Sequence, residues 1–432
     1  MSPHADAIVV GAGPAGCAVA LGLVKLGHRV TVLDAPRRID TIEGVARRAV
    51  DWLRHGGFTL SLDAAAQREA FWNGEHSRAN VEQLVSRGDF DRMLVDDLAV
   101  AGVTVRRARA QRVSKASVQI AGGDVLQAQL VVDARGRTGN RAPLSGRQRE
   151  PDSLRGPPTL SLVQTWSGPH VEPATAVFAF DDGWGWLARR ADGTRVTQLT
   201  IAANAPGLPR GNELSSWLRA RVAALPVARA WTETCSPRNV AAARASTAIF
   251  RSPWRDGVLR VGDAAMAVDP LSGNGIFQAL SSASVAPAVI NTLLRREDSS
   301  ALALQFYRDR CRHLFERFAR IGRDFYRAET RWRDRPFWRA RSAWPDDELP
   351  YDRRDSAFRS IERRPVVDNG FICERDVVVT DDHPLGVWRV DDVEVAPLVR
   401  ELEGLSPFER RTRVDASAPG LKAWCKRVGL ST

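Results

Sequence analysis

Lysine and cysteine are both scarce in this chain of 432 residues. Lys and Arg together number 62, yet only Lys25, Lys115, Lys422 and Lys426 are lysines. The cysteines form no C-x-x-C pair, and none has a histidine at the spacing of zinc ligands. The sequence therefore predicts neither a metal site nor a disulfide framework. The cysteines are Cys17, Cys235, Cys311, Cys373 and Cys425.

Long hydrophobic runs and targeting signals are also missing. The first residues lack the basic region of a secretory signal. The most apolar window, Ile8–Val24, is interrupted by Gly and Pro and is too short to span a membrane comfortably. Because the composition, 44% hydrophobic and 26% charged, is that of a globular protein, we expect a cytoplasmic protein with no membrane span.

The charge balance is strongly basic, with a net charge of +11. Such a surplus is typical of proteins that bind nucleic acid, an anionic membrane or an acidic protein. The chain has no nucleic-acid-binding motif and no lysine-rich arm, so we expect no nucleic-acid partner. Two interpretations stay open: an arginine-rich composition that also attracts an anionic cofactor, or a surface for an acidic protein or peptide.

The N-terminal segment has the pattern of a dinucleotide-binding unit. A short apolar strand, Ala7–Val10, is followed by the glycine-rich turn, a helix over Cys17–Lys25 and a second strand, Arg29–Leu33. The glycines allow the turn, the approach of a pyrophosphate and close helix packing, while an acid after the second strand accepts ribose hydroxyls. The predicted cofactor contacts are Gly11, Ala12, Gly13, Pro14, Ala15, Gly16 and Asp34.

A second segment, Gly257–Leu280, predicts a strand followed by a loop and a helix. A carboxylate at the end of the strand Val258–Val261 can accept hydrogen bonds from a polyol. The N-terminus of the following helix offers free N–H groups and a partial positive charge to the N1–C2=O edge of a flavin. The predicted contacts here are Gly262, Asp263, Pro270, Gly273, Asn274 and Gly275.

With two further segments, Ser86–Val105 and Leu130–Gly139, this order of motifs resembles the single-Rossmann FAD enzymes. That family includes aromatic hydroxylases, flavin-dependent halogenases and geranylgeranyl reductases. The resemblance implies FAD, held non-covalently, with Asp263 at the ribitol or ribose and Pro270–Gly275 over the isoalloxazine. It also implies that Arg87 contacts the FAD phosphates or ribose.

Thr41–Phe58 resembles the G-E-S-L loop and helix of the halogenases, with Glu43 at the acid. Arg47 and Arg48 replace the prolines of that pattern, and either could reach the FAD phosphates or simply face solvent.

The halogenase activity itself is not expected. Halogenases of this family use an active-site lysine after that helix, and residues 58–90 contain no lysine. Their W-x-W-x-I-P pattern survives only as Trp184 and Trp186. Two residues apart on a strand, these indoles share one face, where they pack in the core or, with Pro270, line a pocket.

The fold class predicted is α/β, with a Rossmann-type FAD-binding domain, an antiparallel-sheet substrate domain and a small C-terminal α+β module. The FAD-binding domain comprises 1–58, 86–150 and 251–335, interleaved with a substrate domain of 59–85 and 151–250. Residues 155–250 alternate as strands do. A basic amphipathic helix is expected over Ser299–Trp332, with an apolar stripe of Phe306, Leu314, Phe318, Ile321 and Phe325.

The module, 346–432, is expected to contain strands at 373–382 and 386–395 and helices at 396–405 and 419–429. We interpret it as a possible docking site for a partner.

The resemblance implies an NAD(P)H- and O₂-dependent monooxygenase that works through a flavin C4a-hydroperoxide, so no protein nucleophile is required. The lysine-free pattern with a basic C-terminal module is most similar to the flavoprotein monooxygenases of tryptophylquinone biogenesis in quinohaemoprotein amine dehydrogenase. Their substrate is a tryptophan inside a polypeptide. A small-molecule hydroxylase, a halogenase-like or alkylhalidase-like enzyme, a geranylgeranyl-reductase-like enzyme and a non-catalytic flavoprotein stay open as alternatives.

Overall fold

The computed structural model describes residues 5–35, 41–137, 153–209, 211 and 213–430. The chain divides into two compact units. Unit 1 comprises residues 1–284 and 314–347, and unit 2 comprises residues 285–313 and 348–432. One boundary falls inside helix α8 (Ser300–Ala328), so residues 285–313 group with the C-terminal segment.

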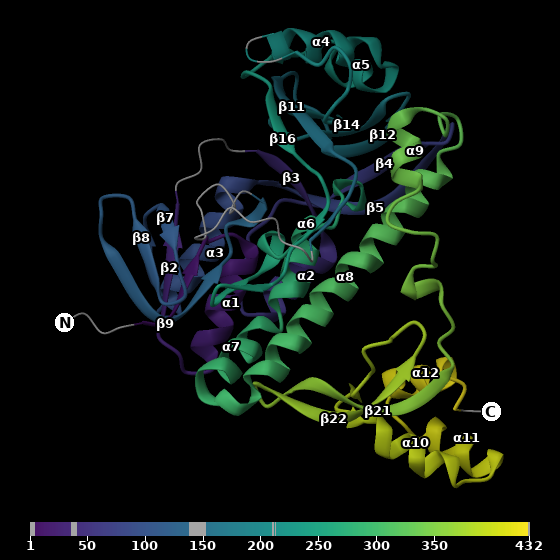
Figure 1. The fold of residues 1–432 in the computed structure, drawn as a ribbon. Helices are drawn as coiled ribbons and strands as arrows, with labels where there is room; N and C mark the ends of the chain where they lie inside the picture. The colour runs from purple at the N-terminus through teal and green to yellow at the C-terminus, as the bar shows by residue number, and fades with distance from the viewer. Residues whose placement is uncertain (1–4, 36–40, 138–152, 210, 212, 431–432) are drawn as a thin grey trace. The chain divides into compact units, whose positions relative to one another are not determined.

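Unit 1 contains a largely parallel sheet with the strand order β18-β19-β9-β1-β2-β6 (Figure 1). The apolar run at the N-terminus forms a strand, as predicted, and this strand lies inside the sheet between β9 and β2. Helix α1 (Pro14–Lys25) follows this strand, and α3 (Arg87–Val100) precedes β6. The strands are β1 (Ala5–Val10), β2 (Val30–Asp34), β6 (Thr104–Arg107), β9 (Val125–Asp133), β18 (Trp254–Arg255) and β19 (Val258–Arg260).

One face of this sheet packs against a hairpin made by β7 (Ala110–Val113) and β8 (Ser117–Ile120). Ile8 and Val10 of β1 and Val131 of β9 lie in the resulting apolar core. Helix α1 is buried along most of its length, so the parallel strands are enclosed as α/β sheets require.

The second sheet of unit 1 has the order β15-β11-β14-β13-β12-β4-β5-β3 and is mostly antiparallel, except that β4 and β12 are parallel. The predicted strand alternation over residues 159–202 is confirmed. The strands are β3 (Ile42–Ala46), β4 (Ala66–Trp72), β5 (Glu75–Ser86), β11 (Thr159–Ser167), β12 (Ala174–Phe180), β13 (Gly183–Arg189), β14 (Thr194–Ala202), β15 (Ser236–Pro237) and β16 (Ala242–Ala245), which pairs with β11.

Two helices interrupt the region where only strands were expected: α4 (Glu213–Ala224) and α5 (Pro226–Thr232). Leu214, Leu218 and Val222 recur at four-residue steps and pack against Leu162 and Phe178 of the sheet. The helices therefore cover one face of this sheet (Figure 1). A spacing of four residues marks a helix, so this expectation was wrong for residues 213–232.

The opposite face of the sheet carries an aromatic cluster. Trp184 and Val177 of the sheet pack with Tyr326 of α8 and with Phe337 and Trp338 of α9 (Pro336–Ser342). Rings in this cluster meet mostly edge to face, as between Tyr326 and Trp338, whose centroids are 5.8 Å apart.

The predicted apolar stripe of α8 is wrong. Phe325 is 53% exposed, and its predicted companions are only partly buried. The buried stripe is the neighbouring one, which contains many small or polar-aromatic residues. It comprises Ala303, Tyr307, Cys311, Phe315, Ala319, Gly322 and Tyr326. Burial follows the i, i+4 geometry of the helix, so a search for strongly apolar residues selects the wrong face.

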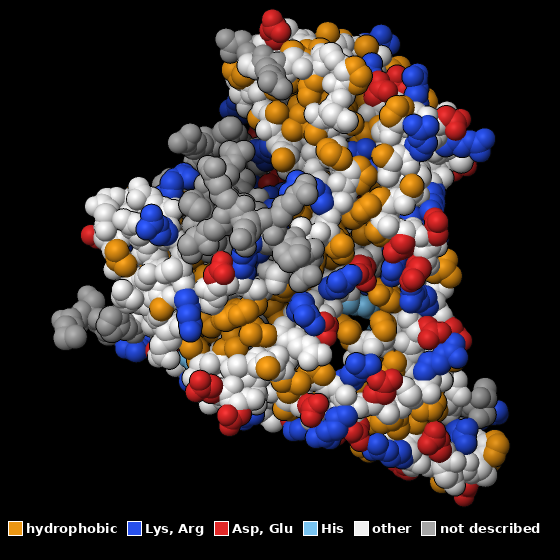
Figure 2. All heavy atoms as spheres, in the orientation of Figure 1, with side chains coloured by type: hydrophobic (Ala, Val, Ile, Leu, Met, Phe, Trp, Pro, Cys, Tyr) orange, Lys and Arg blue, Asp and Glu red, His pale blue; other side chains and the backbone are white. Residues whose placement is uncertain are grey.

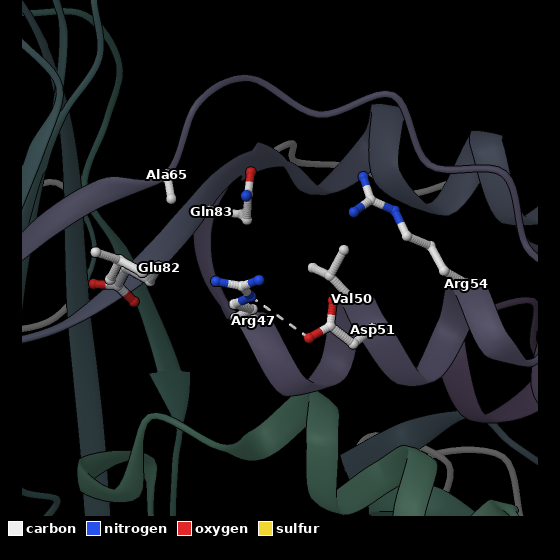
Figure 3. A pocket seen from close by; sticks show the side chains of 8 residues that line it. Arg47, Val50, Asp51, Arg54, Ala65, Glu82 and Gln83 are labelled. Atoms are coloured by element: carbon white, nitrogen blue, oxygen red, sulfur yellow. Dashed lines mark ion pairs between the residues drawn. The ribbon is translucent and has the colours of Figure 1, made fainter.

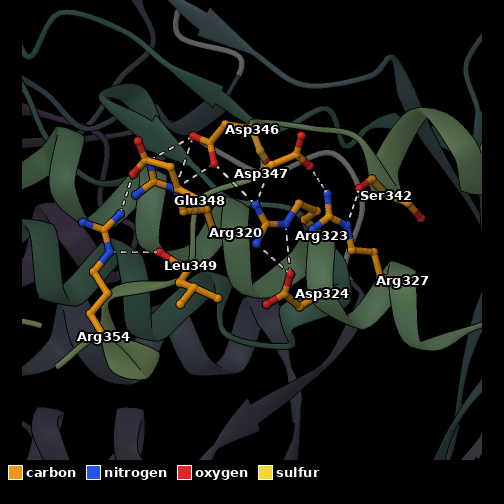
Figure 4. Close-up of polar contacts among 10 residues, drawn as sticks. All are labelled: Arg320, Arg323, Asp324, Arg327, Ser342, Asp346, Asp347, Glu348, Leu349 and Arg354. Atoms are coloured by element: carbon orange, nitrogen blue, oxygen red, sulfur yellow. Dashed lines mark hydrogen bonds and ion pairs between the residues drawn. The ribbon is translucent and has the colours of Figure 1, made fainter.

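Ion pairs within unit 1 join α8 to the segment that follows α9 (Figure 4). Arg320 Nη2 lies 2.9 Å from Asp346 Oδ2, and the buried Arg323 Nη2 lies 2.8 Å from Asp324 Oδ1. Arg323 also donates to the carbonyl oxygen of Asp346. The charges of these buried arginines are thus paired, which fixes the chain at residue 346.

Unit 2 is built around a long hairpin of β21 (Phe358–Asp368) and β22 (Phe371–Thr380) (Figure 1). Its turn, Asn369–Gly370, has positive φ at both residues, as a two-residue hairpin requires. Asn291 Nδ2 of α7 (Ala286–Arg295) donates to Gly370 O, and Ile372 N donates to Thr292 Oγ1. The turn is therefore anchored on α7.

The remaining elements of unit 2 form its apolar core with β22. The strand at 373–382 and the helices at 396–405 and 419–429 are confirmed in type. The expected strand at 386–395 is instead a short hairpin, and β21 and α11 were not predicted. These elements are β23 (Arg389–Val390), β24 (Val393–Glu394), α10 (Val395–Glu403), α11 (Pro407–Asp415) and α12 (Pro419–Arg427).

By length and composition, one helical stretch in the described part of the chain, Gly275–Arg295, could cross a membrane. It consists of α6 (Gly275–Ala283) and α7, and 56% of its most apolar window is buried inside the protein. Burial of this kind is also found in core helices of globular proteins.

Candidate functional site

The predicted cofactor residues gather at one edge of the parallel sheet. Gly11 follows β1, Asp34 ends β2, Asp133 ends β9, and Gly262 follows β19. Since these strands are parallel, their carboxyl ends lie at the same edge. Ligands of open α/β sheets bind at this edge, and four separate sequence segments supply it here.

Glycine allows close approach where these segments meet. A Cβ on Gly16 would lie 1.9 Å from Gly11 O, and a Cβ on Gly262 would lie 2.6 Å from Ala15 Cβ. Gly11 has φ of +116° and a Cβ there would lie 2.5 Å from Ala134 O. The first turn, the Asp133-Ala134 segment and the Gly262-Asp263 turn therefore pack together only without these side chains.

Asp263 lies in the 3-10 helix η2 (Gly262–Ala264), and Arg137 faces it. Arg137 Nε lies 3.2 Å from Asp263 Oδ2, while the other guanidinium nitrogens donate to Thr247 O and Val268 O. Burial raises the pKa of Asp263, although the charges of Arg137 and Arg87 oppose this shift. The positive charge of Arg87, the first residue of α3, therefore acts on Asp263 as well.

Arg87 is held between two carboxylates rather than standing alone. Its Nη1 lies 2.9 Å from Glu43 Oε2, and its Nε lies 2.8 Å from Asp91 Oδ1. Although burial opposes the charge, these two acids raise the pKa of Arg87. The geometry joins the predicted Glu43 and Arg87 into one partly buried ion-pair group.

Arg47 and Arg48, at the start of α2 (Arg47–His55), have different surroundings. The side chain of Arg47 is 81% exposed and lies 3.6 Å from Asp51. The guanidinium of Arg48 lies 4.3 Å from the centre of the Phe277 ring on α6, and burial lowers its pKa. Both arginines are exposed to solvent, and the guanidinium of Arg48 also packs on the Phe277 ring.

A hollow of about 240 Å³ lies between α2 and β5 (Figure 3). Glu82 borders it, and its Oε1 accepts a hydrogen bond from Trp186 Nε1 at 3.2 Å. The lining residues are Arg47, Val50, Asp51, Arg54, Ala65, Val81, Glu82 and Gln83.

The segment Pro270–Gly275, called here the flavin loop, begins with a side-chain cap. Asp269 Oδ1 accepts from Leu271 N at 2.9 Å and starts the 3-10 helix η3 (Pro270–Ser272). Gly273 has φ of +60°, which permits the reversal into α6. Asn274 stands at the N-cap of α6, and Gly275 is its first residue. The predicted Pro270, Gly273, Asn274 and Gly275 thus form one turn into a helix N-terminus.

A buried hydrogen-bonded chain ties this loop to the aromatic face of the second sheet. Trp184 Nε1 donates to Tyr326 Oη at 3.2 Å, and Tyr326 Oη donates to Asp269 Oδ1 at 3.0 Å. Burial raises the pKa of both Tyr326 and Asp269. Trp184 is therefore a packed and hydrogen-bonded core residue, whereas the partly buried Trp186 meets Glu82 on the same face.

Sequence reasoning missed several residues of this site. Asp269 stands inside the recognised segment, directly before Pro270, so its position was a usable signal. Arg68, whose guanidinium lies against Gly273, belongs to the lysine-free stretch 58–90, where the halogenase pattern points only to a lysine. Tyr326 gives no local signal, because it reaches the loop from α8 only in the folded chain.

These residues fit FAD. The glycine-lined edge leaves room for a pyrophosphate, Asp34 and Asp263 supply carboxylate acceptors for hydroxyls, and the flavin loop ends at a helix N-terminus. Among the described residues, no group of three or more His, Cys, Asp and Glu side chains could hold a metal ion.

Comparison with known proteins places the chain among flavoproteins. The lycopene cyclase protein family matches residues 6–183. Digeranylgeranylglycerophospholipid reductase 1 of Methanopyrus kandleri is 28% identical over 333 residues, which cover 71% of this chain and 85% of the reductase. The flavin-dependent halogenase CmlS is 17% identical and shares the fold, with a TM-score of 0.70 over 99% of this chain and 92% of its own.

The peptidyl tryptophan dihydroxylase QhpG, essential for tryptophylquinone cofactor biogenesis, is similar over the whole length. It is 42% identical, with a TM-score of 0.84, and the match covers 99% of this chain and 100% of QhpG. The match therefore includes the C-terminal segment. The chain belongs to the family of FAD-dependent flavoprotein monooxygenases that includes this tryptophan dihydroxylase.

Proposed function

We propose that this protein hydroxylates the indole of a tryptophan within a polypeptide during maturation of a tryptophylquinone cofactor. The similarity to QhpG over both full chains carries the proposal. Reduced nicotinamide and O₂ would be the co-substrates, and the bound FAD would supply the redox and oxygen-transfer chemistry.

The residues of this chain would bind FAD, orient the substrate and exclude water from the reacting centre. Asp34 and Asp263 would accept hydroxyl hydrogen bonds, and the glycine-rich turn with α1 would hold the pyrophosphate. The aromatic face beside the flavin loop would shield the reacting centre from water and offer rings on which an indole can pack.

The polypeptide nature of the substrate draws on two further observations. Unit 2 adds a folded hairpin and helices that enclose their own core, which a small substrate would not need. The net charge of +11 would attract an acidic partner. We further propose that the enzyme acts in the cytoplasm and that residues 346–432 take part in docking the partner.

Intact-mass analysis of a candidate precursor polypeptide tests the proposal. The precursor is incubated with the FAD-loaded enzyme, NADH or NADPH, and O₂. We expect a gain of one or two oxygen masses, located on a tryptophan by peptide fragmentation. Free tryptophan should gain none. Efficient hydroxylation of free tryptophan, or an unmodified precursor with fully reduced and reoxidised flavin, would contradict the polypeptide substrate.

Halide should have no effect on the product. Residues 58–90 contain no lysine to capture a hypohalous acid, and an arginine is a far weaker nucleophile at neutral pH because it keeps its proton. With chloride or bromide added, we expect no halogenated tryptophan, free or peptide-bound. A chlorinated product detected by mass spectrometry would instead support the halogenase alternative.

The match to a prenyl-lipid reductase favours a second candidate, reduction of isoprenoid double bonds. The two functions differ in their use of oxygen. A hydroxylase consumes O₂ in proportion to modified substrate, whereas a reductase saturates its substrate under anaerobic conditions. Oxygen uptake with the precursor and with a prenyl lipid distinguishes them.

A further inference from the structure

Arg68 is the cationic side chain that the sheet directs at the flavin loop. It lies on β4, where alternation places Ala66, Arg68, Ala70 and Trp72 on one face. Ala70 and Trp72 pack in the aromatic cluster with Leu271 of the flavin loop. Arg68 thus stands on the same face as this cluster.

The guanidinium reaches the loop directly. Its Nη1 lies 2.9 Å from the position that a Cβ on Gly273 would occupy, and both Cζ and Nη2 lie 3.7 Å from it. A Cβ at residue 273 would therefore displace the guanidinium of Arg68, and Gly273 leaves that guanidinium in place.

In the part of the chain that the structure describes, Arg68 is also unpaired. Among the residues that the structure describes, no side chain forms an ion pair or hydrogen bond with its guanidinium, which is only half-buried. The acids on neighbouring positions are engaged elsewhere: Glu82 with Trp186, and Asp269 with Leu271 N and Tyr326.

The local electrostatics make an unpaired cation unfavourable there. Arg68 lies beside the turn that leads into the N-terminus of α6, which carries a partial positive charge. Two positive groups lie close together, and no carboxylate of the described residues pairs with Arg68, so an anion would be favoured there. Reduction of bound flavin by two electrons, with uptake of one proton, creates such an anion at its N1–C2=O edge.

We propose that Arg68 stabilises the anionic reduced flavin and thereby raises the reduction potential of the bound FAD. This inference rests on the proposed use of FAD but not on the identity of the substrate. Arginine suits the role, since it stays protonated and offers several donors, whereas a lysine is a compact, more strongly hydrated charge.

The test is the midpoint potential of the FAD-loaded enzyme, measured by reductive titration with a reference dye and without any substrate. Arg68→Met should lower the equilibrium constant for reduction at least tenfold, which is about 30 mV for a two-electron couple. Arg68→Lys should recover part of the shift. The matched control is Arg78→Met on β5, which removes an equal charge from an exposed position and should leave the potential unchanged.

If Arg68→Met releases FAD, titration of its apoprotein with oxidised and with reduced FAD gives the same quantity. The ratio of the two dissociation constants should then shift at least tenfold toward the oxidised form. An unchanged midpoint potential in Arg68→Met, or an unchanged ratio of the two dissociation constants, would overturn the inference. This holds even if the variant has a higher KM for the polypeptide. Failure of precursor hydroxylation by the wild-type enzyme would refute the proposed function while leaving this measurement intact.

Discussion

At the scale of single residues, binding and burial have opposite effects on the carboxylate of Asp263. It stands ready to accept hydroxyl hydrogen bonds from FAD, yet burial raises its pKa above the ordinary value of 3.8. The charged carboxylate therefore favours FAD binding but lowers the stability of the folded protein. Such conflicts are typical of functional sites, where a local cost to stability is retained for chemistry.

Asp263→Asn should therefore separate binding from stability. Loss of a charged acceptor should weaken FAD binding by about 1.5–3 kcal/mol, roughly 10- to 100-fold in Kd. Because the pKa of Asp263 is higher in the folded protein than the ordinary value of 3.8, this group contributes stability below pH 3.8. That contribution is lost as the pH rises through the pKa of the folded state. At neutral pH the FAD-free variant should thus be at least as stable as the wild type in urea.

That advantage should shrink as the pH falls toward 3.8, where the wild-type carboxyl becomes neutral too. Flavin titration and urea unfolding of the apoprotein over this pH range measure both effects. A variant that is destabilised at neutral pH would show that the ion pair with Arg137 outweighs the burial cost.

At Glu329, in contrast to Asp263, hydrogen bonds outweigh burial and the pKa is lowered. Burial disfavours its charge, but hydrogen bonds from Arg331 and from Asn73 N–H lower its pKa below the ordinary value of 4.5. Asn73 N lies 2.7 Å from Oε2, and Arg331 Nη2 lies 2.7 Å from the same oxygen. The stability from this group is present above the unfolded pKa and is lost as pH falls through the folded pKa.

Glu329→Gln should lower the free energy of unfolding by about 1.5–3 kcal/mol at neutral pH and by much less in acid. Denaturant unfolding at several pH values measures this. Glu75→Gln, at an exposed position of the same hairpin, is the matched control. An equal loss at all pH values would mean that Glu329 contributes packing rather than charge.

At the scale of elements, α8 shows that tertiary packing determines which face of a helix is buried. Phe315 is 1% exposed and lies 5.9 Å from the ring centres of both Phe250 and Trp344, whereas Phe325 is 53% exposed. The two residues are chemically identical, so only tertiary packing distinguishes them.

Phe315→Ala should destabilise the protein by about 3–5 kcal/mol, since it leaves a cavity in a packed core. Phe325→Ala should change stability by less than about 0.5 kcal/mol. Thermal unfolding of the two variants makes the comparison. Similar losses would contradict the assignment of the buried face.

At the scale of the whole molecule, the net charge of +11 has to be compared with the distribution of charged side chains. On the face shown in Figure 2, Lys and Arg side chains are interspersed with Asp and Glu side chains. On this face, attraction of an acidic polypeptide would act through the net charge of +11 rather than through one dense patch.

Association with an acidic precursor should weaken as the ionic strength rises from about 0.01 M to 1 M, because the Debye length falls from about 30 Å to 3 Å. Surface-attached precursor and full-length enzyme give this dependence directly, and the FAD content of the enzyme is checked at each salt concentration. Affinity that does not change with salt would remove the electrostatic argument for an acidic partner.

Truncation is a poor test of whether residues 346–432 take part in docking the partner. Deleting residues 346–432 removes Gly370 and Ile372, the hydrogen-bond partners of Asn291 and Thr292 on α7. It also removes Asp346, the partner of the buried Arg320. We expect the shortened chain to lose solubility, so that substitutions within the full chain are the better test of docking.

Local pattern determined much of this protein. The strand-turn-helix at the N-terminus, the strand before Gly262 and the turn at Pro270–Gly275 are all specified by short-range steric and capping rules. The hairpin turn at Asn369–Gly370 carried the same kind of signal and was overlooked. Such features depend only on neighbouring residues, so the sequence by itself contains them.

Tertiary structure decided what depends on distant residues. The buried face of α8 is chosen by what packs against it, and Tyr326 meets Asp269 although 57 residues separate them. Arg68 became a candidate only when the fold placed its guanidinium against Gly273, far away in the sequence. Burial, ion pairing and the absence of a partner are properties of three-dimensional surroundings, and no local spacing encodes them.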